Sequence, residues 1–282
     1  GLELAVHAGE IYGLVGPDGA GKTTSIRVLA GLMGADAGEA RVDGKDPMRD
    51  RVAVRERIGY MPQQYSLYGD LTIDENLAFF ADMFCLPEKE YRERADRLLA
   101  LTRLERFRSR RADALSGGMY KKLALSCSLL HRPRLLLLDE PTNGVDPVSR
   151  REFWDLLGEF THEGMAVLIS TPYMDEAARC HRVGLMHHGR MLVEGRPGEL
   201  VRGFPHSVLR AVGGDREGLT ARLGVHPRVL ALSPAGSRVR VVVERGGEAE
   251  VRALISEQGA TCEGAVPDFE DLFLARLREE ES

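Results

Sequence analysis

Residues 16–24 read GPDGAGKTT and decide the fold of the chain. They fit the phosphate-loop pattern G-x-x-x-x-G-K-[ST], in which a strand runs into a glycine-rich turn and a helix follows. Residues 10–16 (EIYGLVG) predict the strand, and residues 22–32 (KTTSIRVLAGL) predict the helix. The glycines allow a tight turn whose N–H groups face one concavity, and the helix N-terminus adds positive potential there. The segment therefore predicts a site for phosphate groups.

Lys22 and Thr23 supply the charged and hydroxyl groups of this loop. The Lys22 ammonium would lie on the β- and γ-phosphates, and the Thr23 hydroxyl would face Mg²⁺. The alternative is a glycine-rich turn with an incidental lysine, in a chain that holds 31 glycines. The phosphate loop is favoured because lysine is scarce in this chain, and the lysine of this region falls where the motif requires it.

The composition excludes several classes of protein. The chain has 282 residues, of which 43% are hydrophobic, and this excludes wholesale disorder. The formal net charge of -5 argues against a nucleic-acid-binding surface over the whole chain. The four cysteines lie far apart without a CxxC pair, so neither a zinc site nor a disulfide framework is expected. No hydrophobic run approaches the roughly 20 residues that span a bilayer, and no signal peptide is expected.

Up to residue 203, predicted strands alternate with predicted helices, which favours an α/β fold with a largely parallel sheet. Besides residues 10–16, the expected strands are a short β-rich stretch at 37–44, residues 56–62, 134–140 and 164–170, and a pair around Gly189. Hydrophobic residues recur at three- and four-residue spacing from Leu71 to about Leu130, which predicts a helical subdomain at about residues 66–130. Further helices are expected at 149–161 and 173–181.

The character of the sequence changes near Arg202–Pro205, so residues 204–282 are expected to form a small accessory domain. Its core order is βαββαβ, which is the ferredoxin-like arrangement. The expected elements are strands at 207–212, 228–233, 238–244 and 260–266, and helices at 215–223, 248–258 and 268–279.

Two acids, Asp139 and Glu140, close the hydrophobic run at 135–138. Parallel sheets bind ligands at the carboxyl ends of their strands. Asp139 would therefore hold Mg²⁺ opposite Thr23, and Glu140 would orient or deprotonate the attacking water. The alternative is that the two acids only cap a helix, and the presence of a phosphate loop in the same chain makes this interpretation less favoured.

Residues 115–119 read LSGGM and open a second helix with an anion-binding N-terminus. A chain with two phosphate sites and one set of acids suggests a sandwich dimer, in which each second site closes the nucleotide of the partner. The alternative, a capped helix start, explains this segment equally well by itself.

Together the motifs resemble those of the ATP-binding subunits of ABC transporters. The phosphate loop, Gln63 in YMPQ, the signature LSGGM, the strand LLLLDEP and the loop NGVDP occur in the family's order within residues 1–200. Kinases and GTPases with a phosphate loop lack the LSGG element. The stretches DEPTNGVDPVSRREFW and STPYMDEAARC resemble ATPases of ABC-2-type exporters, including drug-resistance systems. The resemblance implies an ABC-type phosphate-loop ATPase domain, with a mixed sheet core and a helical subdomain, at residues 1–203.

The resemblance also implies ATP and Mg²⁺ as cofactors, with Glu140 as the catalytic base. Mg²⁺ would be served by Thr23, Gln63 and Asp139. The residues that it places around the ATP phosphates are Gly16, Pro17, Asp18, Gly19, Ala20, Gly21, Lys22, Thr23 and Thr24.

Other residues are implied to act between subunits. Asp146 would lie at the dimer seam, and the stretch from Tyr65 to Asn76 would help to dock a helix of a membrane partner. The residues expected to cap the γ-phosphate on the opposing subunit are Ser116, Gly117, Gly118 and Met119. The alternative for Gln63 is a surface loop residue, and for Tyr65 and Tyr68 it is ordinary surface or packing aromatics.

The sequence departs from the family at three places. Pro172 stands where the family usually has a histidine that contacts the γ-phosphate, and proline has neither a side-chain donor nor an N–H. Hydrolysis would then be slow, rely on Glu140 alone, or occur at a partner's intact site. Met119 replaces the commoner glutamine. The adenine-stacking aromatic lies before Gly1 in the family's order, so we expect a truncated N-terminal strand region and interpret Tyr12 as a core residue.

The function expected from the sequence is that of an ATP-binding and hydrolysing subunit that powers an ABC transporter, an ABC-2-type exporter for drug or other efflux, with a rate that depends on Pro172 at the switch position. ATP would drive head-to-tail dimerisation of two such domains beside an integral-membrane subunit, at the inner face of the cell membrane, with no nucleic acid bound. Two alternatives stay open: a soluble ABC protein acting on ribosomes or DNA, and an ATP-binding regulatory partner that does not hydrolyse.

Overall fold

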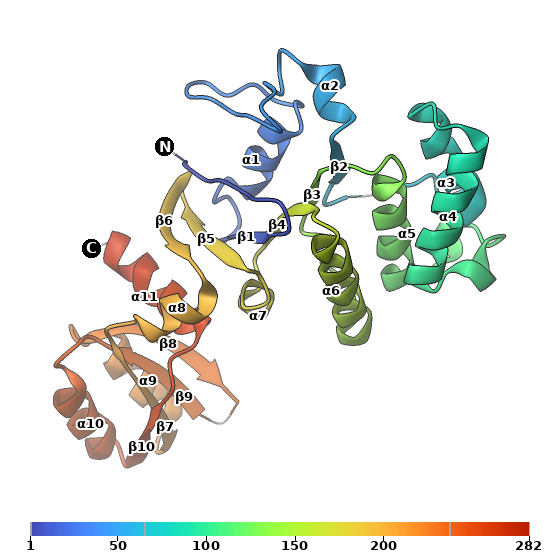
Figure 1. The fold of residues 1–282 in the computed structure, drawn as a ribbon. Coiled ribbons are helices and arrows are strands. Elements are labelled where there is room, and N and C mark those ends of the chain that lie inside the picture. The colour runs from blue at the N-terminus through green and yellow to red at the C-terminus, as the bar shows by residue number, and fades with distance from the viewer. Residues whose placement is uncertain (1, 65, 237, 282) are drawn as a thin grey trace. The chain divides into compact units, whose positions relative to one another are not determined.

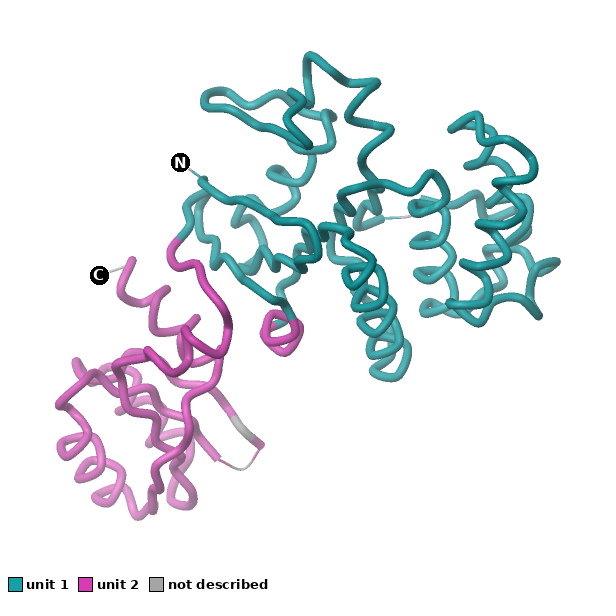
Figure 2. The backbone as a smooth tube through the Cα atoms, viewed as in Figure 1, with its two compact units in different colours: residues 1–173, 180–191 teal, residues 174–179, 192–282 magenta. Residues whose placement is uncertain are grey.

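The computed structural model describes residues 2–64, 66–236 and 238–281. Its contacts divide the chain into two compact units, which Figure 2 colours separately. The first unit comprises residues 1–173 and 180–191, and the second comprises residues 174–179 and 192–282. The sequence placed the division at residue 203, whereas the second unit already begins at Leu192 and also takes in the short segment 174–179.

A six-stranded sheet has the strand order β2-β3-β4-β1-β5-β6 (Figure 1); its first five strands belong to the first unit, and β6 continues into residues of the second. Its strands are β1 (Ile11–Val15), β2 (Ile58–Met61), β3 (Leu135–Asp139), β4 (Ala166–Thr171), β5 (Arg182–His187) and β6 (Arg190–Gly195). The first five pair in parallel. β1, β3 and β4 are buried nearly throughout, as their continuous hydrophobic sequences predict. The α/β class expected from the sequence is confirmed.

Helices connect the strands of this sheet along the chain, and α1 begins with the site residues Lys22 and Thr23. They are α1 (Lys22–Leu29), α2 (Arg51–Arg55), α6 (Pro147–His162) and the four-residue α7 (Met174–Ala177). The helical subdomain contains α3 (Ile73–Met83), α4 (Glu88–Thr102) and α5 (Gly117–Leu129), with short 3₁₀ turns at Glu105–Phe107 and Ala112–Ala114. These three helices pack against one another, and α5 also contacts β2 (Figure 1).

Two expected elements of the first unit differ from the structure. Residues 37–44 form no strand, and Val42 makes only an isolated bridge to Lys45. A lone bridge closes only a turn, because a strand requires a neighbour along its length. The helix expected at 173–181 is also wrong beyond residue 177, because the His181 N–H already donates to the Ile11 carbonyl and the chain is entering β5.

The second unit contains a four-stranded antiparallel sheet with the order β10-β7-β9-β8. Its elements run β7 (Ser207–Gly213), α9 (Arg216–Gly224), β8 (Val229–Ala235), β9 (Arg238–Val243), α10 (Glu248–Glu257) and β10 (Ala260–Ala265). This is the βαββαβ order that the sequence predicts. Side chains of α9 and α10 share one hydrophobic core with the sheet, including Leu219, Leu223, Val251 and Ile255.

Two further helices complete the second unit, α8 (Pro197–Arg202) and the closing helix α11 (Phe269–Glu281). α11 packs beside β8 and buries Phe269 and Leu272. Arg240 of β9 fastens this helix, because its Nε donates to Oδ1 of Asp271 at 2.7 Å and its guanidinium also reaches the Val266 carbonyl. Asp271 is only 1% exposed, so the pair is shielded from water. In the part of the chain that the structure describes, no helix is long and apolar enough to cross a membrane.

We predict that Asp271→Ala loosens α11 from the sheet, because it removes the buried partner of Arg240 and leaves that charge only the more exposed carboxylate of Asp268. Breaking a buried ion pair costs about 3–5 kcal/mol. Hydrogen exchange of the β9 and α11 amides should accelerate accordingly. The matched control is Glu263→Ala. Glu263 pairs with Arg210 but is far more exposed than Asp271, so its loss should alter hydrogen exchange little. Equal protection in the two variants would contradict the role given to Asp271.

Candidate nucleotide site

The phosphate loop lies between β1 and α1, and close packing fixes its path. A Cβ on Gly16 would lie 2.2 Å from the Met186 carbonyl oxygen of β5, so no larger residue fits there. Gly21 has φ +104° and forms the N-cap of α1. No side chain caps this helix, so its first N–H groups face the loop without a side-chain acceptor. The backbone therefore offers an anion the concavity that the sequence predicts.

Lys22 lies inside this loop and is only 4% exposed. Its Nζ donates to the carbonyls of Gly16 at 2.7 Å and Pro17 at 2.9 Å. Burial lowers the pKa of the Lys22 ammonium, while Glu140 and other nearby acids act to raise it. The cation is thus held in place by the same loop whose N–H groups would receive a phosphate.

Asp139 joins the phosphate loop to the end of the sheet. Its Oδ1 accepts hydrogen bonds from Thr23 Oγ1 at 2.9 Å and from Ser170 Oγ at 2.7 Å. Its Oδ2 is buried without a hydrogen-bond partner, which is costly for a carboxylate oxygen. A hydroxyl beside an unpaired carboxylate oxygen is a donor set of hard oxygens that suits Mg²⁺, which typically takes its other ligands from phosphates and water. The residues present therefore fit the metal that the sequence predicts.

Glu140 follows Asp139 and turns its carboxylate toward Gln63. Gln63 Nε2 donates to Glu140 Oε2 at 2.7 Å. The backbone of Glu140 has φ +46°, and its N–H is held by Ser170 Oγ at 3.0 Å. The left-handed backbone redirects the chain at the end of β3, so that the two acids leave the strand in different directions. Glu140 is 7% exposed, and its negative charge acts to raise the pKa of the Lys22 and Lys121 ammonium groups, which burial lowers.

Ser170 is a residue of the site that sequence reasoning missed. Its hydroxyl donates to Asp139 and accepts from the Glu140 N–H, so one side chain fixes both acids. It is fully buried near the end of β4, next to β3 in the sheet. A polar residue at the carboxyl end of a buried hydrophobic strand was the available signal.

Pro172, at the expected switch position, comes directly after the end of β4. Thr171 Oγ1 accepts the Tyr173 N–H at 3.0 Å, and the Tyr173 hydroxyl donates to Asn143 Oδ1 at 3.4 Å. The guanidinium of Arg150 lies 4.7 Å from the centre of the Tyr173 ring. Tyr173 therefore brings an aromatic hydroxyl to the loop after Glu140, and sequence reasoning had given it no role.

The signature segment packs against the start of α6 within the same chain. Ser116 caps α5, and its Oγ accepts the Met119 N–H at 3.3 Å. A Cβ on Gly118 would lie 2.3 Å from Ser149 Oγ, so this glycine permits the close approach of the two helices. Asp146 caps α6 through Oδ1, which accepts the N–H groups of Val148 and Ser149 at 3.0 Å. The capping alternative that the sequence left open for LSGGM is thus realised, and Ser116 itself remains exposed.

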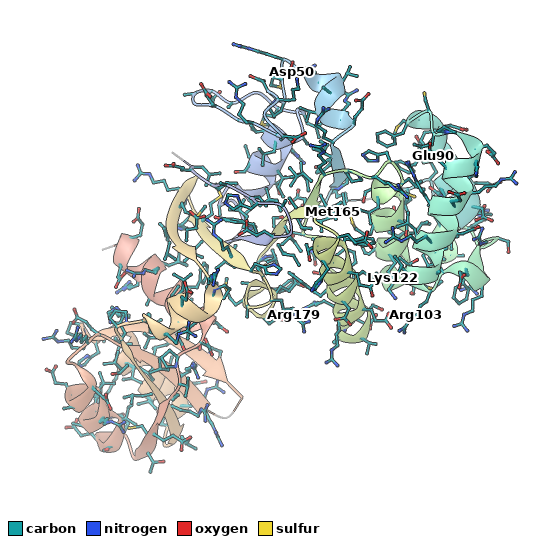
Figure 3. All side chains as sticks on the ribbon, viewed as in Figure 1. Asp50, Glu90, Arg103, Lys122, Met165 and Arg179 are labelled. Atoms are coloured by element: carbon teal, nitrogen blue, oxygen red, sulfur yellow. The ribbon has the colours of Figure 1, made fainter. Side chains whose placement is uncertain are left out.

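Ion pairs also connect the helical subdomain with α6. Lys122 of α5 and Arg103, which follows α4, both pair with Glu152 of α6, and Figure 3 shows Lys122 and Arg103 from these two elements. Lys122 is only 8% exposed, so its pairing is the better shielded of the two. The signature helix and the helix that Asp146 caps are therefore connected by charge as well as by packing.

The segment expected to dock a membrane partner lies between β2 and α3. Tyr65 falls outside the described residues. Tyr68 is 48% exposed, and its ring meets Phe79 of α3 edge-on at 4.6 Å. Asn76 is fully buried and holds this segment, since it accepts the Tyr68 N–H and donates to the carbonyls of Tyr68 and Leu71.

The remaining candidates of the sequence lie away from the phosphate loop's open face. Tyr12 is fully buried in the hydrophobic core, as interpreted. None of the nearby histidines takes the place of the switch residue within the described chain, because His162 bonds its own helix at Gly158, and His181 accepts the Ile11 N–H. His187 ends β5 and His188 follows it, and their rings lie tilted against each other with centres 4.0 Å apart.

Comparison with known proteins agrees with this geometry. The family model described as "ABC transporter" matches residues 1–143. The chain is 41% identical over 98% of its length to "Probable multidrug ABC transporter ATP-binding protein YbhF" of Escherichia coli, of which it covers 48%. It is 37% identical over 97% of its length to "Nod factor export ATP-binding protein I" of Rhizobium meliloti, of which it covers 82%. The chain thus spans about half the length of the first relative and most of the second.

Among solved structures, a dimeric post-hydrolysis state of the ATP-binding cassette MJ0796 bound to ADP and Pi aligns with a TM-score of 0.61. The two sequences are 26% identical, and the alignment covers 68% of this chain and 88% of that one. With the loop, the acids and the signature segment in place, the fold and the comparisons lead to one conclusion: the chain belongs to the family of ABC transporter ATP-binding proteins.

Proposed function

We propose that this chain is the ATP-binding and hydrolysing subunit of an ABC-2-type exporter. The observation that carries the proposal is the cluster in which Thr23 and Ser170 donate to Asp139 while Gln63 donates to Glu140. It brings the phosphate loop, both acids and the Gln63 segment to one edge of the sheet. Such an arrangement suits phosphoryl transfer to water, where positioning and charge stabilisation supply most of the catalysis.

Within this proposal each residue has a separate task. The loop N–H groups and Lys22 bind the ATP phosphates, and Thr23 and Asp139 would hold Mg²⁺, with Gln63 near it. When bound, Mg²⁺ neutralises charge that develops on the phosphate oxygens. Glu140 accepts a proton from the attacking water, and Gln63 holds the Glu140 carboxylate in place. Ser170 fixes the direction in which the two acids leave the strands.

A second copy or a related ATPase domain is the proposed partner across the nucleotide. Ser116 and Gly117 are exposed at the start of α5, where a helix N-terminus favours an anion. With Gly118 and Met119 they would meet the γ-phosphate on the opposing subunit, and Asp146 would lie at the seam. The similarity of this chain to the ATP-binding cassette MJ0796, whose solved structure is a dimer, supports this proposal. ATP would then stabilise the closed pair only through its higher affinity for that state.

A membrane subunit is the second proposed partner. The exposed side chains of Tyr68, Phe79 and Met83 provide an apolar surface for one of its cytoplasmic segments. The chain would therefore act at the inner face of the cell membrane. The names of relatives, a multidrug transporter protein and a Nod factor export protein, favour export as the direction.

One observation favours a second candidate, an ATP-binding partner that hydrolyses slowly or not at all. Pro172 places no hydrogen-bond donor at the switch position, and the Tyr173 hydroxyl is directed at Asn143. Loss of one donor to a developing charge commonly costs about 10²–10³ in rate. The two candidate functions predict different rates of ATP hydrolysis but the same binding of ATP.

We predict that Lys22→Ala weakens Mg-ATP binding about 10- to 100-fold, because a charged hydrogen bond contributes about 1.5–3 kcal/mol. Isothermal titration with Mg-ATP measures this loss. Lys45→Ala is the matched control, since Lys45 is exposed in a turn distant in sequence from the loop. Wild-type affinity in the Lys22 variant would overturn the phosphate-loop assignment.

Glu140→Gln should bind Mg-ATP with unchanged affinity and lose turnover, because glutamine keeps the hydrogen bond to Gln63 but accepts no proton. Light scattering coupled to gel filtration should then detect an ATP-dependent dimer. The same variant with ADP is the control and should remain monomeric. A monomer at saturating Mg-ATP would count against the sandwich, and retained turnover would count against Glu140 as the base.

Pro172→His should raise steady-state turnover about 10²-fold, since it restores one donor toward the γ-phosphate. Pro172→Ala is the matched control, because it removes the ring without adding a side-chain donor. Phosphate release measured for wild type and both variants, with Glu140→Gln as the blank, separates the two candidates. Equal rates in the histidine and alanine variants would show that position 172 does not limit hydrolysis.

A further inference from the structure

Two side chains in the first turns of the signature helix α5 form hydrogen bonds to backbone groups of Gln63 and Leu67. These residues belong to the connection between β2 and α3, which we call the Gln63 segment. Lys121 Nζ donates to the Gln63 carbonyl at 3.4 Å. Tyr120 Oη accepts the N–H of Leu67 at 3.1 Å. These two neighbouring side chains therefore hold the segment near its beginning and near its end. Backbone groups of a connecting segment that are bonded to a helix move with that helix.

The Gln63 segment also carries the side chain that hydrogen-bonds to Glu140, the proposed general base. Gln63 Nε2 donates to Glu140 Oε2 at 2.7 Å. Beyond Leu67, the buried Asn76 of α3 holds Tyr68 through both its N–H and its carbonyl. The segment is thus fixed by α5 at residues 63 and 67 and by α3 at residue 68. The position of the Gln63 amide, and with it that of the Glu140 carboxylate, depends on where α5 lies.

The charge of Lys121 adds to this arrangement. Partial burial lowers the pKa of the Lys121 ammonium, whereas the nearby negative charge of Glu140 acts to raise it. The charge of Glu140 likewise acts to raise the pKa of Lys22 in the phosphate loop. Lys122, next along α5, points elsewhere and pairs with Glu152 of α6. The two consecutive lysines therefore connect the same helix to two different parts of the site.

The start of the same helix is the surface that the proposed function assigns to a partner's nucleotide. Ser116 caps α5 and is exposed, and only four residues separate it from Lys121. A force on Ser116 is transmitted to Lys121 along little more than one helical turn, which is stiff because its hydrogen bonds are formed internally.

We propose that Tyr120 and Lys121 are positioning residues, which set Gln63 against Glu140 and so make hydrolysis in one subunit depend on the placement of its signature helix. The inference rests on the proposed function, since it needs Glu140 as the base and Ser116 at the partner's nucleotide. Neither residue touches the reacting atoms. Their contribution is to the rate of the chemical step, and ATP binding to the phosphate loop does not require them.

The test compares Lys121→Gln, Lys121→Arg and Tyr120→Phe with Lys89→Gln in the full chain. Lys89 is an exposed lysine of α4 in the same helical subdomain and serves as the control. We expect Lys121→Gln to lower kcat about 10-fold and Tyr120→Phe about 5-fold, as for the loss of one charged or neutral hydrogen bond. The Kd for Mg-ATP should stay within about twofold of wild type in every variant, because the loop is untouched.

Two further readouts separate positioning from simple loss of structure. Lys121→Arg should recover most of the rate, since it restores a cation that donates to the Gln63 carbonyl. The double variant of Tyr120→Phe and Lys121→Gln should lose less than the product of the single effects, because both act on one segment. A kcat equal to that of Lys89→Gln, or no recovery with arginine, would overturn the proposal.

Glu140→Gln keeps this failure distinct from failure of the proposed function. If Glu140→Gln abolishes turnover while the Tyr120 and Lys121 variants match Lys89→Gln, only the positioning role is wrong. If Glu140→Gln retains wild-type turnover, the base itself is misassigned and the positioning role falls with it.

Discussion

The site depends above all on the carboxylate of Asp139. One of its oxygens receives hydroxyl hydrogen bonds from Thr23 at the start of α1 and from Ser170 near the end of β4. These residues come from three elements, and the buried carboxylate brings them together at the carboxyl edge of the sheet. Its second oxygen is left without a hydrogen-bond partner in the interior. An arrangement with that cost is expected where a ligand completes it.

The surrounding fold can be understood as support for this cluster. Parallel pairing of β3 with β4 and of β4 with β1 fixes where the three strand ends lie. Close approach at Gly16 leaves the loop one path over β5. The left-handed backbone of Glu140 then separates the direction of its side chain from that of Asp139. The proposed function in this way assigns metal binding and base chemistry to two consecutive residues, Asp139 at the end of β3 and Glu140 directly after it.

The sequence predicted most of this site because its motifs are local. A phosphate loop needs only a strand, a turn and a helix in succession, and residues 10–32 contain all three. The acids after β3 were predictable from the hydrophobic run that precedes them. The class and element order of the second unit followed from alternation alone, although its extent did not, because residues 174–179 join it through contacts distant in sequence.

What the sequence could not reveal depends on contacts between distant segments. Ser170 looked like part of a strand until β4 placed it beside Asp139. Tyr120 and Lys121 read as an unremarkable continuation of the signature helix until the fold put them on the Gln63 segment. Residues 37–44 were expected to be β-rich, but a strand forms only where a neighbour pairs with it along its length, and here only the bridge between Val42 and Lys45 forms.

The most direct test of the account is a crystal structure of the chain with ATP and Mn²⁺, in which anomalous scattering locates the metal. The account predicts one metal peak bonded to Thr23 Oγ1 or to a water on Asp139 Oδ2, with Lys22 Nζ moved from the Gly16 and Pro17 carbonyls to the phosphates. Mg²⁺, for which Mn²⁺ stands in here, lies about 2.0–2.1 Å from its oxygen ligands. A metal peak remote from Thr23 and Asp139, with phosphates outside residues 16–24, would contradict it.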